Sequence, residues 1–129
     1  MSFISLVALT VENYDDALSF YCEVLGFELV EGSPSLTTDG RPKRWVVVRP
    51  PGAETGLLLA KADGADQLAT VGNQHGGRVG FFLRVDDFAR TLAALEAAGA
   101  TIHGEPRIEP YGTVVVFEDL YGNKWDLLG

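Results

Sequence analysis

The stretch NYDDALSFYCEVLGFELVE, residues 13–31, reads as a helix that leads directly into a strand. Asn13 is a favourable N-cap, and Asp15 and Asp16 fall in the first turn, where the helix dipole stabilises carboxylates. Gly26 stands where a helix end favours a left-handed residue, and the strand-like FELVE follows it. Apolar side chains at helical spacing predict the buried face of this helix: Tyr14, Ala17, Leu18, Tyr21, Cys22 and Leu25.

The stretch DDFARTLAALEAAGATIHGE, residues 86–105, repeats this order of events. Phe88, Leu92 and Leu95 point inward from its predicted helix. Strand-like runs flank both stretches: residues 5–11, 45–49, 55–61, 78–85, 112–118 and 124–128. Residues 32–44, with their turn-forming composition, are expected to form a polar loop. The chain is therefore predicted to be one domain, 1–129, with a βαβββ module at about 1–62, a linker at about 62–77 and a second βαβββ module at 78–129.

Composition limits the classes of function. The 129 residues carry a formal net charge of −8 and no basic cluster, which argues against nucleic-acid binding. The apolar run at residues 3–11 is too short for a membrane span. The single cysteine, Cys22, excludes an internal disulfide, and core packing is the favoured interpretation for it. A cytoplasmic protein is the plain expectation.

The segment FYCEVLGFEL (20–29), together with VVVFEDLYGNKWDLL (114–128), resembles the vicinal oxygen chelate superfamily. This superfamily includes glyoxalase I, extradiol dioxygenases, and fosfomycin- and bleomycin-resistance proteins. The resemblance implies an α+β fold in which paired βαβββ modules form a curled mixed sheet around a cleft. It also implies a homodimer.

In enzymes of this superfamily, the first and last strands of each module supply four ligands to one divalent metal. By resemblance these positions fall on Leu6, Leu58, Gly80 (or Val79 or Phe81 in another register) and Asp126. Leucine and glycine side chains offer no donor atom, and a lone carboxylate does not hold a divalent ion against water. We therefore expect no metal cofactor at the usual site. The alternative is one divalent metal, such as Zn, Ni, Fe or Mn, held by relocated ligands.

Strand alternation predicts what lines the cleft instead. If Leu6 faces it, so do Ala8 and Thr10, with Val7, Leu9 and Val11 beneath the helix. If Gly80 faces it, so do Phe82 and Arg84, while Asp126 shares its face with Lys124 and Leu128. A mainly apolar cleft with few polar groups suits a small organic ligand. The candidate ligand-binding residues are Trp45, Leu6, Leu58, Gly80, Phe82, Arg84, Tyr111, Gln74 and Arg78.

Several alternatives stay open at this point. Asp126 is a candidate catalytic base in a metal-free lyase or isomerase, or a group that orients a cationic ligand, or simply the ion-pair partner of Arg84, Lys124 or Arg78. His75 and His103 could join Asp126 or Glu118 in a displaced metal site of a lyase or dioxygenase, although structural roles are favoured for both histidines. A purely structural or regulatory dimer is the remaining possibility.

Overall fold

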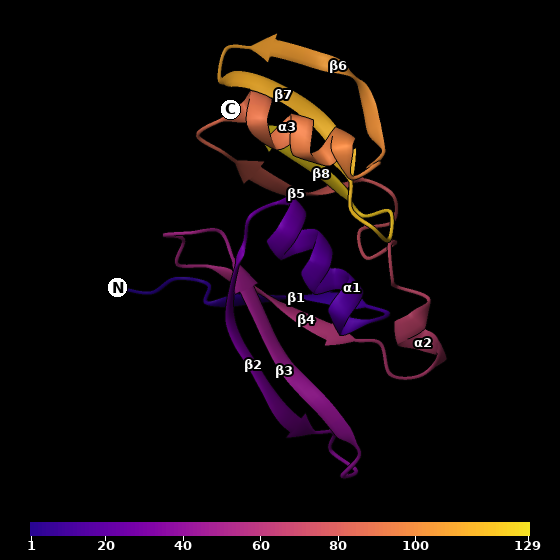
Figure 1. Cartoon of the computed structure of the whole chain (residues 1–129). Coiled ribbons are helices and arrows are strands. Elements are labelled where there is room, and N and C mark those ends of the chain that lie inside the picture. The colour runs from indigo at the N-terminus through magenta and orange to yellow at the C-terminus, as the bar shows by residue number, and fades with distance from the viewer. The chain divides into compact units, whose positions relative to one another are not determined.

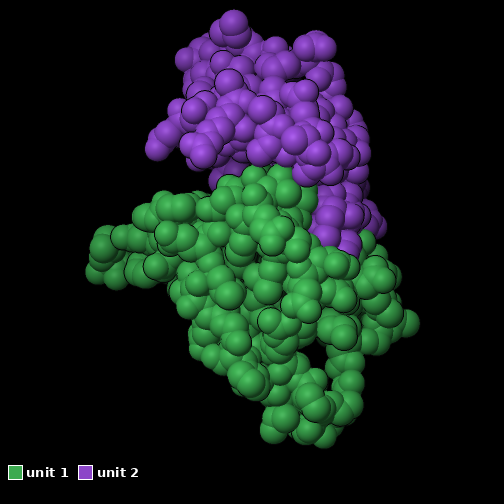
Figure 2. Space-filling view, viewed as in Figure 1, with its two compact units in different colours: residues 1–71 green, residues 72–129 purple.

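The computed structural model describes residues 1–129, which divide into two compact units, 1–71 and 72–129 (Figures 1 and 2). The elements of unit 1 are β1 (Leu6–Val11), α1 (Tyr14–Leu18), η1 (Ser19–Val24), β2 (Glu28–Leu36), β3 (Pro42–Arg49), β4 (Gly56–Lys61) and α2 (Ala65–Leu68). Those of unit 2 are β5 (Val79–Arg84), α3 (Phe88–Ala97), β6 (Ile102–Glu109), β7 (Gly112–Glu118) and β8 (Lys124–Leu128).

Each unit contains one four-stranded mixed sheet. The strand order is β1-β4-β3-β2 in unit 1 and β5-β8-β7-β6 in unit 2. The first and last strands of each module pair in parallel, and the remaining pairs are antiparallel. The predicted α+β class and the repeated βαβββ order are therefore confirmed. No helix is both long enough and apolar enough to cross a membrane.

One face of the unit 1 sheet forms the core. Its buried aliphatic side chains alternate along three strands: Leu9, Val11, Val46, Val48, Leu57 and Leu59. Ala17 of α1 and Tyr21 of η1 are fully buried as well, and α1 contacts β4. Val7 was also expected beneath the helix, but it is 39% exposed, so the covered part of β1 begins at Leu9.

The first helix departs from the regular helix predicted for it. Asn13 caps α1 as expected, accepting a hydrogen bond from the Asp16 amide at 3.0 Å. From Ser19 the helix widens, and the Leu25 amide donates to the carbonyl of Phe20, five residues back. The widened turn changes which side chains face inward. Phe20, which was not among the residues predicted to face inward, is buried, whereas Cys22, which was, is only partly covered.

Most of the predicted polar loop, residues 32–44, is a hairpin instead. Strand β2 continues to Leu36 and pairs with β3 from Pro42 onward. Backbone pairing requires no apolar side chains, and β2 lies at the sheet edge with nearly all its residues exposed, so polar residues and Pro34 are tolerated there. The remaining loop is closed by hydrogen bonds between Thr37 and Arg41. The predicted linker contains the short helix α2.

Candidate functional site

The face of the unit 1 sheet opposite its core is open. Cross-strand partners share a face, so the pairs Ala8–Leu58, Leu58–Val47 and Val47–Glu31 define one row across all four strands. The face that contains this row is called the open face of unit 1. Alternation along the strands extends it on both sides of the row, and its members include Leu6, Thr10, Trp45, Arg49, Gly56 and Ala60.

A cavity of about 310 Å³ lies on this open face and is called the open-face cavity. Trp45 is 36% exposed, and Val47 is 5% exposed. Gly56 leaves room for its neighbours, because a Cβ there would lie 3.4 Å from Leu6 Cδ2 and 3.0 Å from the Val48 carbonyl oxygen. The complete lining is Phe3, Ser5, Leu6, Val30, Glu31, Trp45, Val47, Arg49, Glu54 and Gly56.

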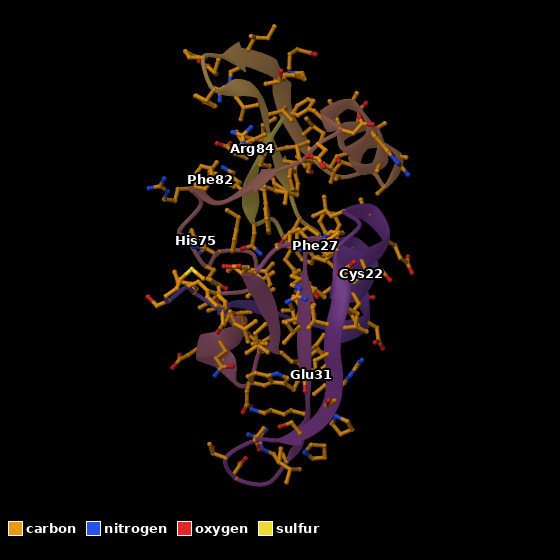
Figure 3. All side chains as sticks on the ribbon, turned by 90° about the vertical axis from the view of Figure 1, so that its left-hand side faces the viewer. Cys22, Phe27, Glu31, His75, Phe82 and Arg84 are labelled. Carbon is orange, nitrogen blue, oxygen red and sulfur yellow. The ribbon has the colours of Figure 1, made fainter.

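Arg49 supplies the unusual polar feature of the open-face cavity. Its Nε atom is buried and has no hydrogen-bond partner. No ion pair joins its guanidinium to the two carboxylates of the lining, Glu31 and Glu54. Glu31 instead accepts a hydrogen bond from the Ser33 hydroxyl at 3.3 Å; Figure 3 marks its position on β2. A buried donor without an acceptor is costly, so an acceptor atom brought to the Arg49 Nε–H would relieve that cost.

A second cavity, of about 620 Å³, opens where β3 and β4 separate, and is called the strand-gap cavity. The two strands pair only at Val47–Leu58 and Val48–Leu57. Beyond these pairs the Tyr14 hydroxyl substitutes for a partner strand: it accepts from the Arg44 amide and donates to the Arg44 carbonyl, both at 3.2 Å. Trp45 lines this cavity as well as the open-face cavity.

An ion pair closes the far end of the gap. Arg41 Nη1 and Nη2 donate to the two carboxylate oxygens of Asp63 at 3.1 and 2.7 Å, and its Nε donates to Asp39. The Arg41 guanidinium holds the pKa of Asp63 below its usual value of 3.8, and at Asp39 the hydrogen bond from the Thr37 hydroxyl, followed by those from Arg41, lowers the pKa in the same way. Both carboxyls are ionised at neutral pH, and because their pKa values are lowered, the pair is lost only as the pH falls below 3.8.

The open face of unit 2 is more polar. The pairs Phe82–Asp126, Asp126–Val116 and Val116–His103 form one row across its four strands. Phe82 is 60% exposed, and Arg84 lies on the same side of β5 (Figure 3). Asp126 forms no ion pair with Arg84, Lys124 or Arg78. His103 Nε2 and Glu118 Oε2 are 2.6 Å apart.

The other predicted site residues of unit 2 lie at its loops and strand ends. Gly80 lies at an irregularity in the β5–β8 pairing, and the His75 ring covers it: a Cβ on Gly80 would lie 2.3 Å from that ring. Arg78 is exposed and donates from Nε to the Val79 carbonyl at 2.9 Å. Gln74 lies in the loop with His75. Tyr111, in the β6–β7 turn, is 56% exposed.

At the four positions where the resemblance predicts metal ligands, the side chains do not form a ligand set for a divalent ion. Leu6 and Leu58 have no donor atoms, and the space beside Gly80 is filled by an imidazole that already packs edge-on against Phe81. Asp126 remains the one donor among the four positions. No group of three or more histidine, cysteine or carboxylate side chains is arranged to hold a metal ion.

Cys22 has the chemistry of a packed thiol. Burial, and secondarily the Glu23 carboxylate, raise the pKa of this thiol above its usual value of 9.0. A raised pKa lowers the thiolate fraction at neutral pH, the opposite of what a nucleophile needs.

Two mixed four-stranded sheets built from consecutive βαβββ modules, with an open face on each, define the fold class of glyoxalases and bleomycin-resistance proteins. The chain belongs to the glyoxalase/bleomycin resistance protein/dioxygenase superfamily, whose family model matches residues 4–127. The resemblance seen in the sequence is thereby confirmed.

Relatives and solved structures cover nearly the whole chain. An uncharacterised protein of Shewanella frigidimarina is 48% identical over 123 residues, spanning 95% of this chain and 89% of its own. The crystal structure of UcmS2 is 29% identical with a TM-score of 0.77, covering 99% of this chain and 98% of that one. TnmS3, an antibiotic-binding protein from Streptomyces sp. CB03234, is also 29% identical, with a TM-score of 0.73 and coverages of 99% and 95%.

Sequence reasoning identified Trp45, Leu6 and Leu58 around the two cavities of unit 1, but it missed Val47, Arg49 and Glu31. A signal for two of these was present, because Val47 and Arg49 follow Trp45 at the spacing of two that places residues on one face of a strand. Glu31 had no such signal, since an irregularity at Leu29–Glu31 shifts the β2–β3 register.

Proposed function

We propose that this protein binds a small aromatic organic molecule in the open-face cavity, without the metal ion used by enzymes of the superfamily. The observation that carries the proposal is that one cavity is lined both by Arg49, whose buried Nε–H has no partner, and by the exposed ring of Trp45. An aromatic ligand that bears a carbonyl oxygen would stack on Trp45 and accept from Arg49.

Two further facts support this proposal. The cavity volume of about 310 Å³ lies in the range of small-molecule sites. A similar protein of known structure, TnmS3, is described as antibiotic-binding. Glu31 and Glu54 at the cavity favour a neutral or cationic ligand over an anionic one. Sequestration of a toxic compound is the simplest role for such a complex.

The test is calorimetric titration with 2-acetonaphthone, with 2-ethylnaphthalene as the analogue that lacks an acceptor, and with tetracycline and bleomycin. Trp45→Ala should weaken binding of both naphthalenes about tenfold or more. Arg49→Met should weaken binding of the ketone alone, by about tenfold or more, because a hydrogen bond to a charged group is worth about 1.5–3 kcal/mol.

Leu68→Ala and Arg90→Met are the matched controls for this test. Both residues are exposed and lie outside the cavity lining. Neither substitution should change either affinity by more than about twofold. If no compound in the panel binds saturably, or if Trp45→Ala binds like the wild type, the proposal is wrong.

A second candidate function is metal-free acid–base catalysis by Asp126. It is favoured by the partly buried position of this carboxylate beside Phe82, with none of the ion-pair partners that a structural role would give it. Incubating the same panel and following it by mass spectrometry tests this function. Asp126→Asn should abolish any turnover while leaving affinity within about threefold; turnover retained in this variant would exclude the role.

A further inference from the structure

The strand-gap cavity concentrates positive charge in an acidic protein. Four of the ten lysine and arginine residues line it: Arg41, Lys43, Arg44 and Lys61. The chain as a whole has a net charge of −8, so most of its surface repels anions. The single carboxylate in the lining, Asp63, is already paired with Arg41.

The two arginines and the two lysines differ in whether their charge is compensated. Arg41 is paired with Asp39 and Asp63. Arg44 is paired with Asp15 at 3.0 Å and lies over the Tyr14 ring. Lys43 and Lys61 form no ion pair, so two ammonium groups at this cavity remain uncompensated.

The cavity wall is held in shape before any ligand arrives. Tyr14 fixes the β3 side through its two hydrogen bonds to Arg44, and the Arg41–Asp63 pair closes the end. Gln67 accepts from the Asp63 amide through Oε1 at 2.8 Å, which leaves its NH₂ group as a donor. A prearranged wall lowers the entropic cost of binding.

We propose that the strand-gap cavity is a second ligand site, which binds the tetrahedral oxyanion of a small aromatic phosphate or sulfate ester. Lys43 and Lys61 neutralise the oxyanion, as lysine does for phosphate as a compact point charge. The Trp45 ring, which also lines this cavity, offers a stacking surface for the aromatic part. The two sites share Trp45 but differ in their polar groups, because Lys43 and Lys61 line only the strand-gap cavity and Arg49 lines only the open-face cavity.

The probe is 1-naphthyl phosphate, with 1-naphthyl sulfate as the second ester, 1-naphthol as the neutral analogue and inorganic phosphate as competitor. Binding is followed by calorimetry at pH 7.5 and low salt. We expect saturable binding of at least one ester that is at least about tenfold tighter than binding of 1-naphthol, and that weakens with added salt. Displacement by inorganic phosphate supports a phosphate site; binding of the sulfate ester alone supports a sulfate site.

The Lys43→Met/Lys61→Met double variant should weaken ester binding about tenfold or more, equivalent to about 1.4 kcal/mol. Arg90→Met, which removes one exposed charge from α3, and Arg49→Met, which alters the open-face cavity, should each stay within about twofold. Equal affinity of the double variant and the wild type would overturn the proposal, as would equal affinity for ester and naphthol. Loss of 2-acetonaphthone binding with ester binding intact would count against the proposed function alone.

Discussion

Phe117→Ala is expected to lower the free energy of unfolding by about 3–5 kcal/mol. Phe117 is fully buried and stacks on Trp125 with a centroid distance of 5.9 Å, and Trp125 stacks in turn on Phe81 at 4.6 Å. The three rings stand on β7, β8 and β5 at paired positions, so they tie the sheet of unit 2 together. Removing the outer ring leaves a cavity beside Trp125 that rigid strands cannot refill.

Urea denaturation followed by tryptophan fluorescence measures this loss, with an expected decrease in the midpoint of roughly 2 M. The matched control is Phe82→Ala, which removes a phenylalanine side chain from the position next to Phe81 on β5. This side chain is 60% exposed. That change should cost less than about 1 kcal/mol. Similar losses in the two variants would mean that the ring stack does not stabilise the sheet as described.

The inward direction of Trp125 was accessible from the sequence, because Asp126 shares one face of its strand with Lys124 and Leu128 and leaves Trp125 and Leu127 on the other. That of Phe117 was not, because residues 114–117 are apolar throughout and do not alternate. The same reasoning fails where backbone geometry breaks the alternation. The irregularity in β5 at Gly80 places His75 over a position expected to face a cleft, and nothing in the spacing of His75 indicates this. A histidine in a glycine-containing loop has many possible directions, and only packing selects one.

The two cavities of unit 1 show a second limit to what can be predicted from the sequence. Trp45 was recognised as a candidate wall, but the separation of β3 from β4 depends on the Tyr14 hydroxyl, which comes from a helix 30 positions earlier in the chain. Likewise Arg41 and Asp63 meet across 22 positions in sequence. Local patterns predict the elements well, whereas these long-range polar contacts arise from how the elements pack, and they determine where the binding surfaces lie.

Asp119→Ala is expected to destabilise the protein by about 2–4 kcal/mol, although it removes little apolar surface. Asp119 is 5% exposed, and its Oδ1 accepts from the amides of Tyr121 and Asn123, both at 2.9 Å. Its Oδ2 accepts from Asn123 Nδ2 at 2.8 Å. This carboxylate therefore organises the β7–β8 turn that carries the DLYGN sequence, and alanine removes the acceptor of all three hydrogen bonds.

Two comparisons isolate the hydrogen-bonding effect in this turn. Asp119→Asn keeps Oδ1 as an acceptor but sets an NH₂ group against Asn123 Nδ2. Its free energy of unfolding should therefore lie between those of the wild type and the alanine variant. Asp86→Ala, an exposed carboxylate before α3, should cost less than about 0.5 kcal/mol. Hydrogen exchange of the Tyr121 and Asn123 amides should accelerate in the alanine variant even where the sheet stays protected. If these two amides keep wild-type protection, Asp119 does not hold the turn, and its geometry must come from the Gly122 backbone alone, whose φ is +98°.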